Sequence, residues 1–95
     1  MTTDSTLPSL ATRLVRSLPS VASDAQLWVH VVDAHLVRVQ CIGRGAPVFL
    51  VSSDGEVLEY RVPAVNHEDA LREFRLGRRF PMPAERLRAA GFTPG

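Results

Sequence analysis

The sequence contains no lysine and very little of several other residue types. All 11 of its basic residues are arginine, and Cys41, Ile42 and Asn66 are the only residues of their kinds. Lysine, isoleucine and asparagine have AT-rich codons, so their scarcity indicates a GC-rich genome, that of a bacterium or of a phage of such a host. Because the arginine excess is in part codon bias, it is a weak sign of function.

Other absences exclude whole classes of protein. A single cysteine cannot form a disulfide within the chain, which excludes a disulfide scaffold and fits a reducing compartment. The longest plainly apolar run, residues 48–51, is far shorter than the roughly 20 residues of a membrane span. The first residues lack the basic and apolar regions of a signal peptide, so we expect a cytoplasmic protein. A net charge of +1 with 45% hydrophobic residues argues against a chain that is disordered overall.

The pattern that is present begins with an amphipathic helix. Apolar residues recur at helical spacing over residues 7–18, and the positions between them are polar or basic. Ser5 or Thr6 can cap the start of this helix, because a side-chain oxygen at that position accepts a free backbone N–H. We expect Pro19 to stop it.

Two further helices are expected in the last third of the chain. The first has acidic residues in its first turn and arginines in its last, which suits the helix dipole at both ends. A linker of residues 78–82 separates it from a second, short helix, which ends at a glycine in the left-handed conformation. The expected boundaries are Asn66 to Gly77 for the first of these helices, and Pro83 or Ala84 to Gly91 for the second.

Four strands, at residues 26–32, 36–42, 48–52 and 57–62, are expected between the helices. In the first pair, a three-residue loop sets Val31 against Val37 and keeps one face apolar. In the second pair, Asp54-Gly55 favours a two-residue hairpin turn, which sets Val51 against Leu58. This register places on one face Phe49, Val51, Leu58 and Tyr60.

These elements predict a single α+β domain over residues 1–95, with loose ends at 1–5 and 93–95. The expected architecture has two layers, in which the helices cover the apolar face of a four-stranded antiparallel meander. The opposite face is mixed, and either it is free or the last helix covers it with Met82, Leu87 and Phe92. The residues of this mixed face that we expect to form a protein interface are Trp28, His30, Arg38, Gln40 and Arg61.

The sequence contains no recognisable catalytic, metal or cofactor motif. The histidines and Cys41 lack neighbours at metal-ligand spacing, and there is no nucleophile motif. Catalysis would need a cleft that unites His30 with a carboxylate. We therefore predict that the protein is not an enzyme and has no metal site, no cofactor and no small-molecule substrate.

The leading hypothesis is a small protein-interaction module that self-associates, as a dimer, through the mixed face or a sheet edge. The alternative is nucleic-acid binding, because arginine side chains bind phosphate and an aromatic ring can stack on a base. A pI of about 8.0 is low for a dedicated nucleic-acid binder. The residues of this alternative are Arg75, Arg78, Arg79, Phe80, Arg86 and Arg88.

Overall fold

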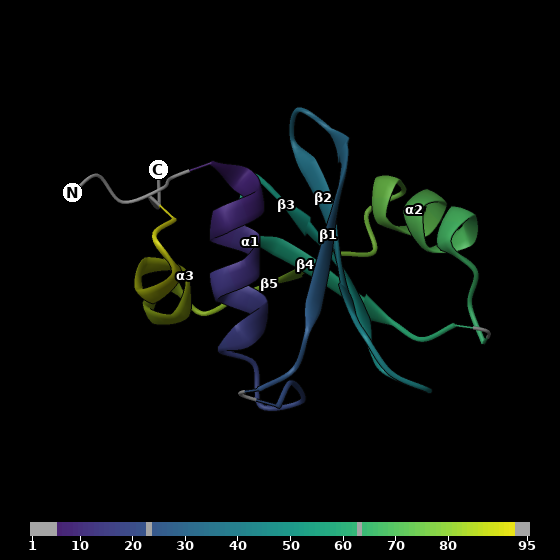
Figure 1. Cartoon of the computed structure of the whole chain (residues 1–95). Coiled ribbons are helices and arrows are strands. Elements are labelled where there is room, and N and C mark those ends of the chain that lie inside the picture. The colour runs from purple at the N-terminus through teal and green to yellow at the C-terminus, as the bar shows by residue number, and fades with distance from the viewer. Residues whose placement is uncertain (1–5, 23, 63, 93–95) are drawn as a thin grey trace.

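The computed structural model describes residues 6–22, 24–62 and 64–92 (Figure 1). The expected loose ends at 1–5 and 93–95, and the Ser5 alternative for the first helix cap, lie outside these ranges. The α+β class is confirmed. In chain order the elements are α1 (Leu7–Arg16), β1 (Leu27–Asp33), β2 (Leu36–Cys41), β3 (Val48–Ser52), β4 (Glu56–Tyr60), α2 (His67–Arg75), β5 (Phe80–Pro81) and α3 (Ala84–Ala90).

The strands form one antiparallel sheet in the order β1-β2-β3-β4-β5. The register of the first hairpin is confirmed, since Val31 lies opposite Val37 and Val29 opposite Val39. Its turn is tighter than expected, because an irregularity after Val31 lets Asp33 pair with Leu36. This bulge absorbs one residue without changing which side chains share a face.

The predicted register of the second hairpin is wrong by one residue. Val51 pairs with Val57 rather than with Leu58, because the loop contains three residues instead of two. The carbonyl of Ser52 accepts the N–H of Gly55 at 3.0 Å, and its hydroxyl accepts the N–H of Glu56 at 3.1 Å. Gly55 has φ +82, so it supplies the extra left-handed residue of a longer loop. As a result, Leu58 and Tyr60 point to the face opposite that of Phe49 and Val51.

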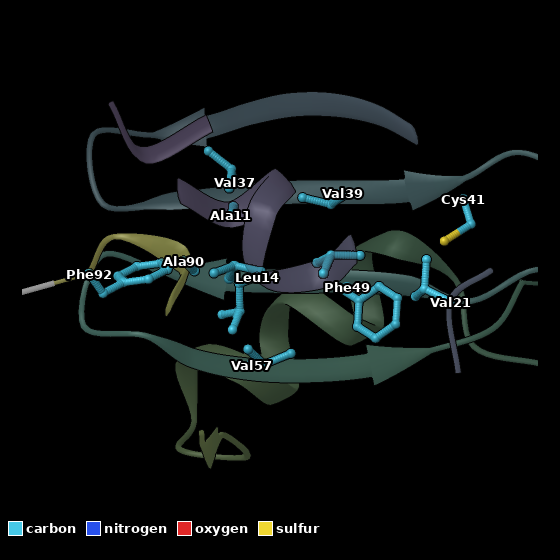
Figure 2. Packing of buried hydrophobic residues seen from close by; sticks show 12 residues of the cluster. Ala11, Leu14, Val21, Val37, Val39, Cys41, Phe49, Val57, Ala90 and Phe92 are labelled. Carbon is cyan, nitrogen blue, oxygen red and sulfur yellow. The ribbon is translucent and has the colours of Figure 1, made fainter. Parts of the chain in front are cut away.

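The sheet is covered on both faces, so the two-layer prediction is corrected to three layers (Figure 1). The physical reason is the shifted register, which makes both faces of β3 and β4 apolar and leaves every residue of β3 buried. Helices α1 and α3 pack on one face, and Figure 2 shows Leu14 of α1 with Phe49 and Val57 of the sheet. Helix α2 packs on the other face, where the buried residues are Leu36, Val48, Leu50, Leu58, Tyr60, Ala70 and Phe74.

The segment expected to be a linker at 78–82 instead contains β5, which extends the sheet beyond β4. Strand β5 carries the chain across the sheet edge, from α2 on one face to α3 on the other (Figure 1). The expectation that the last helix covers the mixed face is therefore wrong, because Leu87 and Phe92 pack into the core beside α1.

The end signals of α2 and α3 were predicted correctly, whereas Thr6 stands at the N-cap of α1 without a side-chain cap hydrogen bond. The side chain of Asn66 accepts the backbone N–H of Asp69 at 2.8 Å and so caps α2. Gly91 is left-handed, and the N–H of Phe92 donates to the carbonyl of Leu87 at 2.9 Å, as in a Schellman motif. Helix α1 ends at Arg16, before the expected stop at Pro19. Within residues 6–22, 24–62 and 64–92, no helix is long and apolar enough to cross a bilayer.

Candidate interaction surface on strand β1

Strand β1 has one free edge. It pairs with β2 on one side, and no described strand lies on its other side. The N–H of Ile42 donates to the carbonyl of Gln26 at 3.0 Å, so the even-numbered residues of β1 direct their backbone groups toward β2. Because such groups alternate along a strand, the N–H and C=O groups of Leu27, Val29 and Val31 point outward from the sheet.

Exposed apolar side chains accompany this free edge. Trp28 is 68% exposed and Val31 is 58% exposed, and they point to opposite faces of the sheet. Helix α2 lies over the part of the sheet near β3 and β4 and leaves the ring of Trp28 in solvent. A large apolar side chain left in contact with water costs free energy that a partner surface would recover.

Four of the five predicted interface residues share one face of the sheet. Trp28 lies opposite Gln40 and His30 lies opposite Arg38 on neighbouring strands. The placement of Arg61 with them is wrong, because its prediction depended on the register of the second hairpin. Arg61 donates to the carbonyl of Gly45 and pairs with Glu59 at 3.9 Å. Glu59 in turn accepts from the hydroxyl of Ser20 at 3.4 Å, in the segment that follows α1.

A cluster of basic and aromatic side chains lies where this face meets α2. The hydroxyl of Tyr60 lies 2.6 Å from Nδ1 of His67, and the two rings meet edge to face with 5.6 Å between their centroids. Arg38 lies near both, and its positive charge acts on both groups. Burial, followed by the positive charges of Arg38 and His30, lowers the pKa of His67. Burial also raises the pKa of Tyr60, so both groups favour their neutral forms.

Sequence reasoning did not include Tyr60 and His67 in this surface. Tyr60 was assigned to the other face by the incorrect register, and His67 was visible only as a residue of a helix's first turn. A signal was nevertheless present in the chain, because an aromatic hydroxyl and an imidazole seven residues apart flank the connection from a strand to a helix.

The arginine group proposed for nucleic-acid binding does not form a single patch. Arg75 pairs with Asp33 at 3.5 Å and Arg78 with Glu73 at 3.8 Å, both on the α2 side. Arg86 donates to the carbonyl of Ser17 at 2.6 Å, at the end of α1 on the opposite side of the sheet. Of the remaining members, Phe80 is exposed on β5 and Arg88 is exposed in the last turn of α3.

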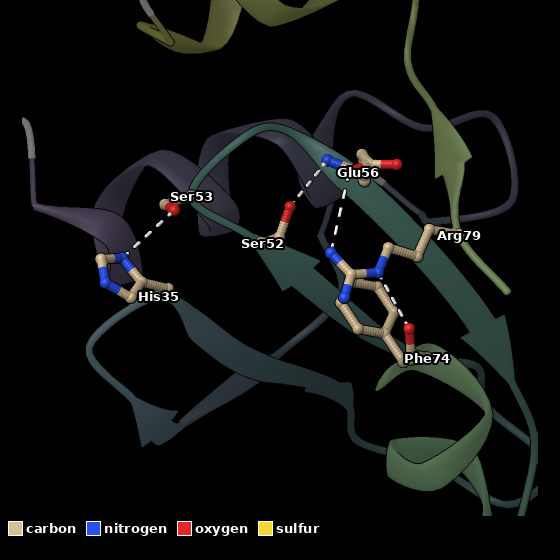
Figure 3. Close-up of polar contacts among 6 residues, drawn as sticks. All are labelled: His35, Ser52, Ser53, Glu56, Phe74 and Arg79. Carbon is tan, nitrogen blue, oxygen red and sulfur yellow. Dashed lines mark hydrogen bonds and ion pairs between the residues drawn. The ribbon is translucent and has the colours of Figure 1, made fainter. Parts of the chain in front are cut away.

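Arg79 is the most firmly held member of this group (Figure 3). Its Nε donates to the carbonyl of Phe74 at 2.9 Å, and its guanidinium lies 4.6 Å above the centre of the Phe74 ring. Its Nη1 also lies 3.8 Å from a carboxylate oxygen of Glu56. These contacts join α2 to β4, so Arg79 has a structural use within the chain. The arrangement of the arginines gives less support to nucleic-acid binding than to a protein interaction.

A cavity of about 430 Å³ opens between the β1–β2 turn, the end of β3 and α2. It contains His35, not His30, together with carboxylates and serines. The Ser53 hydroxyl lies 3.5 Å from Nδ1 of His35, at the outer limit of a hydrogen bond (Figure 3). The carboxylate of Asp33 accepts the backbone N–H of His35 at 2.7 Å. It therefore does not orient the imidazole as the carboxylate of a catalytic triad does.

The described residues also lack the groupings that metal and thiol chemistry require. No group of three or more His, Cys, Asp or Glu side chains that could hold a metal ion occurs in the part of the chain that the structure describes. Cys41 is buried, and burial together with the charge of Glu59 raises the pKa of its thiol. A raised thiol pKa disfavours the nucleophilic thiolate.

Comparison with known proteins identifies no relative: no protein family, curated protein or solved structure matches this chain.

Proposed function

We propose that this protein is a non-enzymatic interaction module that self-associates by pairing its β1 strand with β1 of a second copy. The observation that carries the proposal is Trp28, 68% exposed on a strand whose outer edge is unpaired among the described residues. An unpaired strand edge offers a ladder of N–H and C=O groups to any strand that lies beside it.

The edge of β1 is suited to pairing with itself. Two copies related by a twofold axis place identical strands antiparallel, and each copy then offers the other the same groups. A register centred on Val29 pairs Leu27 of one copy with Val31 of the other, so that outward-pointing backbone groups meet. The same register sets Trp28 beside His30 of the second copy. It uses the regular part of β1 and avoids the irregularity after Val31.

Natural edge strands commonly carry lysine, proline or inward-pointing charge, which prevents pairing with other chains. Strand β1 has neither lysine nor proline, and its one carboxylate, Asp33, stands at its very end. The absence of these protective features supports an edge that is used for association.

The test is sedimentation equilibrium over a wide concentration range, with the variant Val31→Lys. The introduced ammonium group would face Leu27 of the second copy, so we expect the dissociation constant to rise at least roughly tenfold. The matched control is Leu76→Lys, which changes an apolar residue that is 79% exposed on the far end of α2. We expect this control to have the same dissociation constant as the unchanged chain. The proposal is overturned if the unchanged chain stays monomeric at all concentrations. It is also overturned if Leu76→Lys raises the dissociation constant as much as Val31→Lys does.

A further inference from the structure

Arg38 is a half-buried cation that has no carboxylate partner in the part of the chain that the structure describes. Its Nε is buried and meets no hydrogen-bond acceptor among the described residues. Five arginines in the described ranges form ion pairs with Asp or Glu, and Arg38 is not one of them. An uncompensated charge or donor in a partly desolvated position is costly, so its presence at a surface needs an explanation.

A second basic side chain lies beside Arg38, and the carboxylate of β1 on the same face, that of Asp33, is paired with Arg75 at 3.5 Å. His30 lies directly opposite on β1, and Leu50 lies opposite on β3. The positive charge of Arg38 also acts on the hydroxyl of Tyr60. The fields of Arg38 and His30 both reach His67 at the start of α2. The cluster therefore lies in a positive potential.

We infer that Arg38, with His30 and His67 beside it, is a binding site for an oxyanion group, a carboxylate or a phosphate. A guanidinium presents its N–H donors in a fixed fork that matches two oxygens of such a group. The bound group would accept hydrogen bonds from the guanidinium of Arg38 and balance its charge. Trp28, next to His30 on the same face, would contact the apolar part of a larger ligand.

This site belongs to a single chain and does not depend on self-association, although it lies on the face that bears Trp28. A bound oxyanion would balance the charge of Arg38, which the pairing of two β1 strands leaves without a counter-charge. In the register centred on Val29, Asp33 of the second copy would lie beside residue 25, near the other end of β1 from His30 and its neighbour Arg38.

The test is an NMR titration that follows the Nε–H signal of Arg38 and the ring signals of His67. Inorganic phosphate is added in one arm and acetate in the other, at constant ionic strength and at a protein concentration where sedimentation shows only monomer. We expect a saturable shift of both sets of signals. Saturation by phosphate alone assigns a phosphate ligand, and saturation by acetate alone assigns a carboxylate.

Three variants decide whether Arg38 is the receptor. Arg38→Gln should weaken binding at least tenfold, whereas Arg44→Gln, at an exposed arginine in the loop between β2 and β3, should leave it unchanged. Arg38→Lys retains the charge without the fork and should bind with intermediate affinity; it also serves if Arg38→Gln does not fold. Shifts that do not saturate in either arm, or equal affinity in Arg38→Gln and the unchanged chain, would overturn the inference. Self-association is measured separately through Val31→Lys, so failure of one proposal leaves the other standing.

Discussion

The hydroxyl of Tyr60 lies 2.6 Å from Nδ1 of His67, and this contact joins the end of β4 to the first turn of α2. Burial raises the pKa of Tyr60 and lowers that of His67. Both groups therefore favour their neutral forms, and the contact is a hydrogen bond between an uncharged phenol and an uncharged imidazole. The contact is one of the links between the α2 layer and the sheet, and its strength depends on pH.

The first prediction concerns acid. In the unfolded chain His67 takes up a proton near its ordinary pKa of 6.5, whereas in the folded chain it does so at lower pH. The unfolded state binds more protons between these two values, so the free energy of unfolding should fall as the pH drops below about 6.5. Urea denaturation at neutral and at mildly acidic pH measures this loss, and His67→Gln should make it smaller. His35→Gln, at an exposed turn residue, is the control and should retain the full loss. An identical pH response in His67→Gln and the unchanged chain would contradict the assignment.

The second prediction tests the layer formed by α2. Leu50 is completely buried between the sheet and α2, so Leu50→Ala should lower the free energy of unfolding by about 2–5 kcal/mol. Leu76 is 79% exposed, and Leu76→Ala should change it by no more than about 0.5 kcal/mol. Thermal or urea denaturation of the two variants gives the comparison. Equal stabilities would mean that α2 does not cover this face.

The third prediction concerns the loop that shifted the second hairpin. Gly55 has φ +82, and a Cβ there would lie 2.6 Å from Cδ2 of Leu87. Gly45 has φ +69, and a Cβ there would meet nothing within 4 Å. Both alanine variants suffer the cost of a left-handed side chain, about 1–2 kcal/mol, and Gly55→Ala must also displace Leu87.

Gly55→Ala should therefore destabilise the protein more than Gly45→Ala does. In a Leu87→Ala background the two glycine substitutions should cost nearly the same, because the side chain that obstructs the new Cβ is gone. Urea denaturation of the full set of variants measures both differences. If Gly55→Ala still destabilises the protein more than Gly45→Ala does in the Leu87→Ala background, the additional cost comes from the backbone of the loop and not from contact with Leu87.

The first hairpin was predictable because burial selects its register. Any shift by one residue would bring Arg38 or His30 onto the face that packs against α1, at a high cost in desolvation. No such penalty distinguishes the registers of the second hairpin, since Leu58 and Val57 are both apolar and either can face α1. Turn chemistry then favoured a two-residue loop, and the bonds made by Ser52 lengthened it.

The position of α2 could not be predicted for the same reason. Asn66 and Gly91 end their helices through contacts within a few residues, so local sequence was sufficient for them. The face on which a helix packs depends on which strand residues point that way, and a shift of one residue reverses this. Trp28 is exposed, which is one of the two alternatives that the sequence left open, whereas the cluster around Arg38 exists only because α2 places His67 beside Tyr60.

The two borders of the sheet differ in what they offer a neighbouring strand. β5 has only two residues, and one of them, Pro81, has no N–H to donate. Once two chains have joined through β1, each outer border of the combined sheet consists of β5 and of residues 58–60 of β4, so a third chain finds only short lengths of ladder to extend. Growth of the sheet would therefore stop at two copies and would not continue into a fibre.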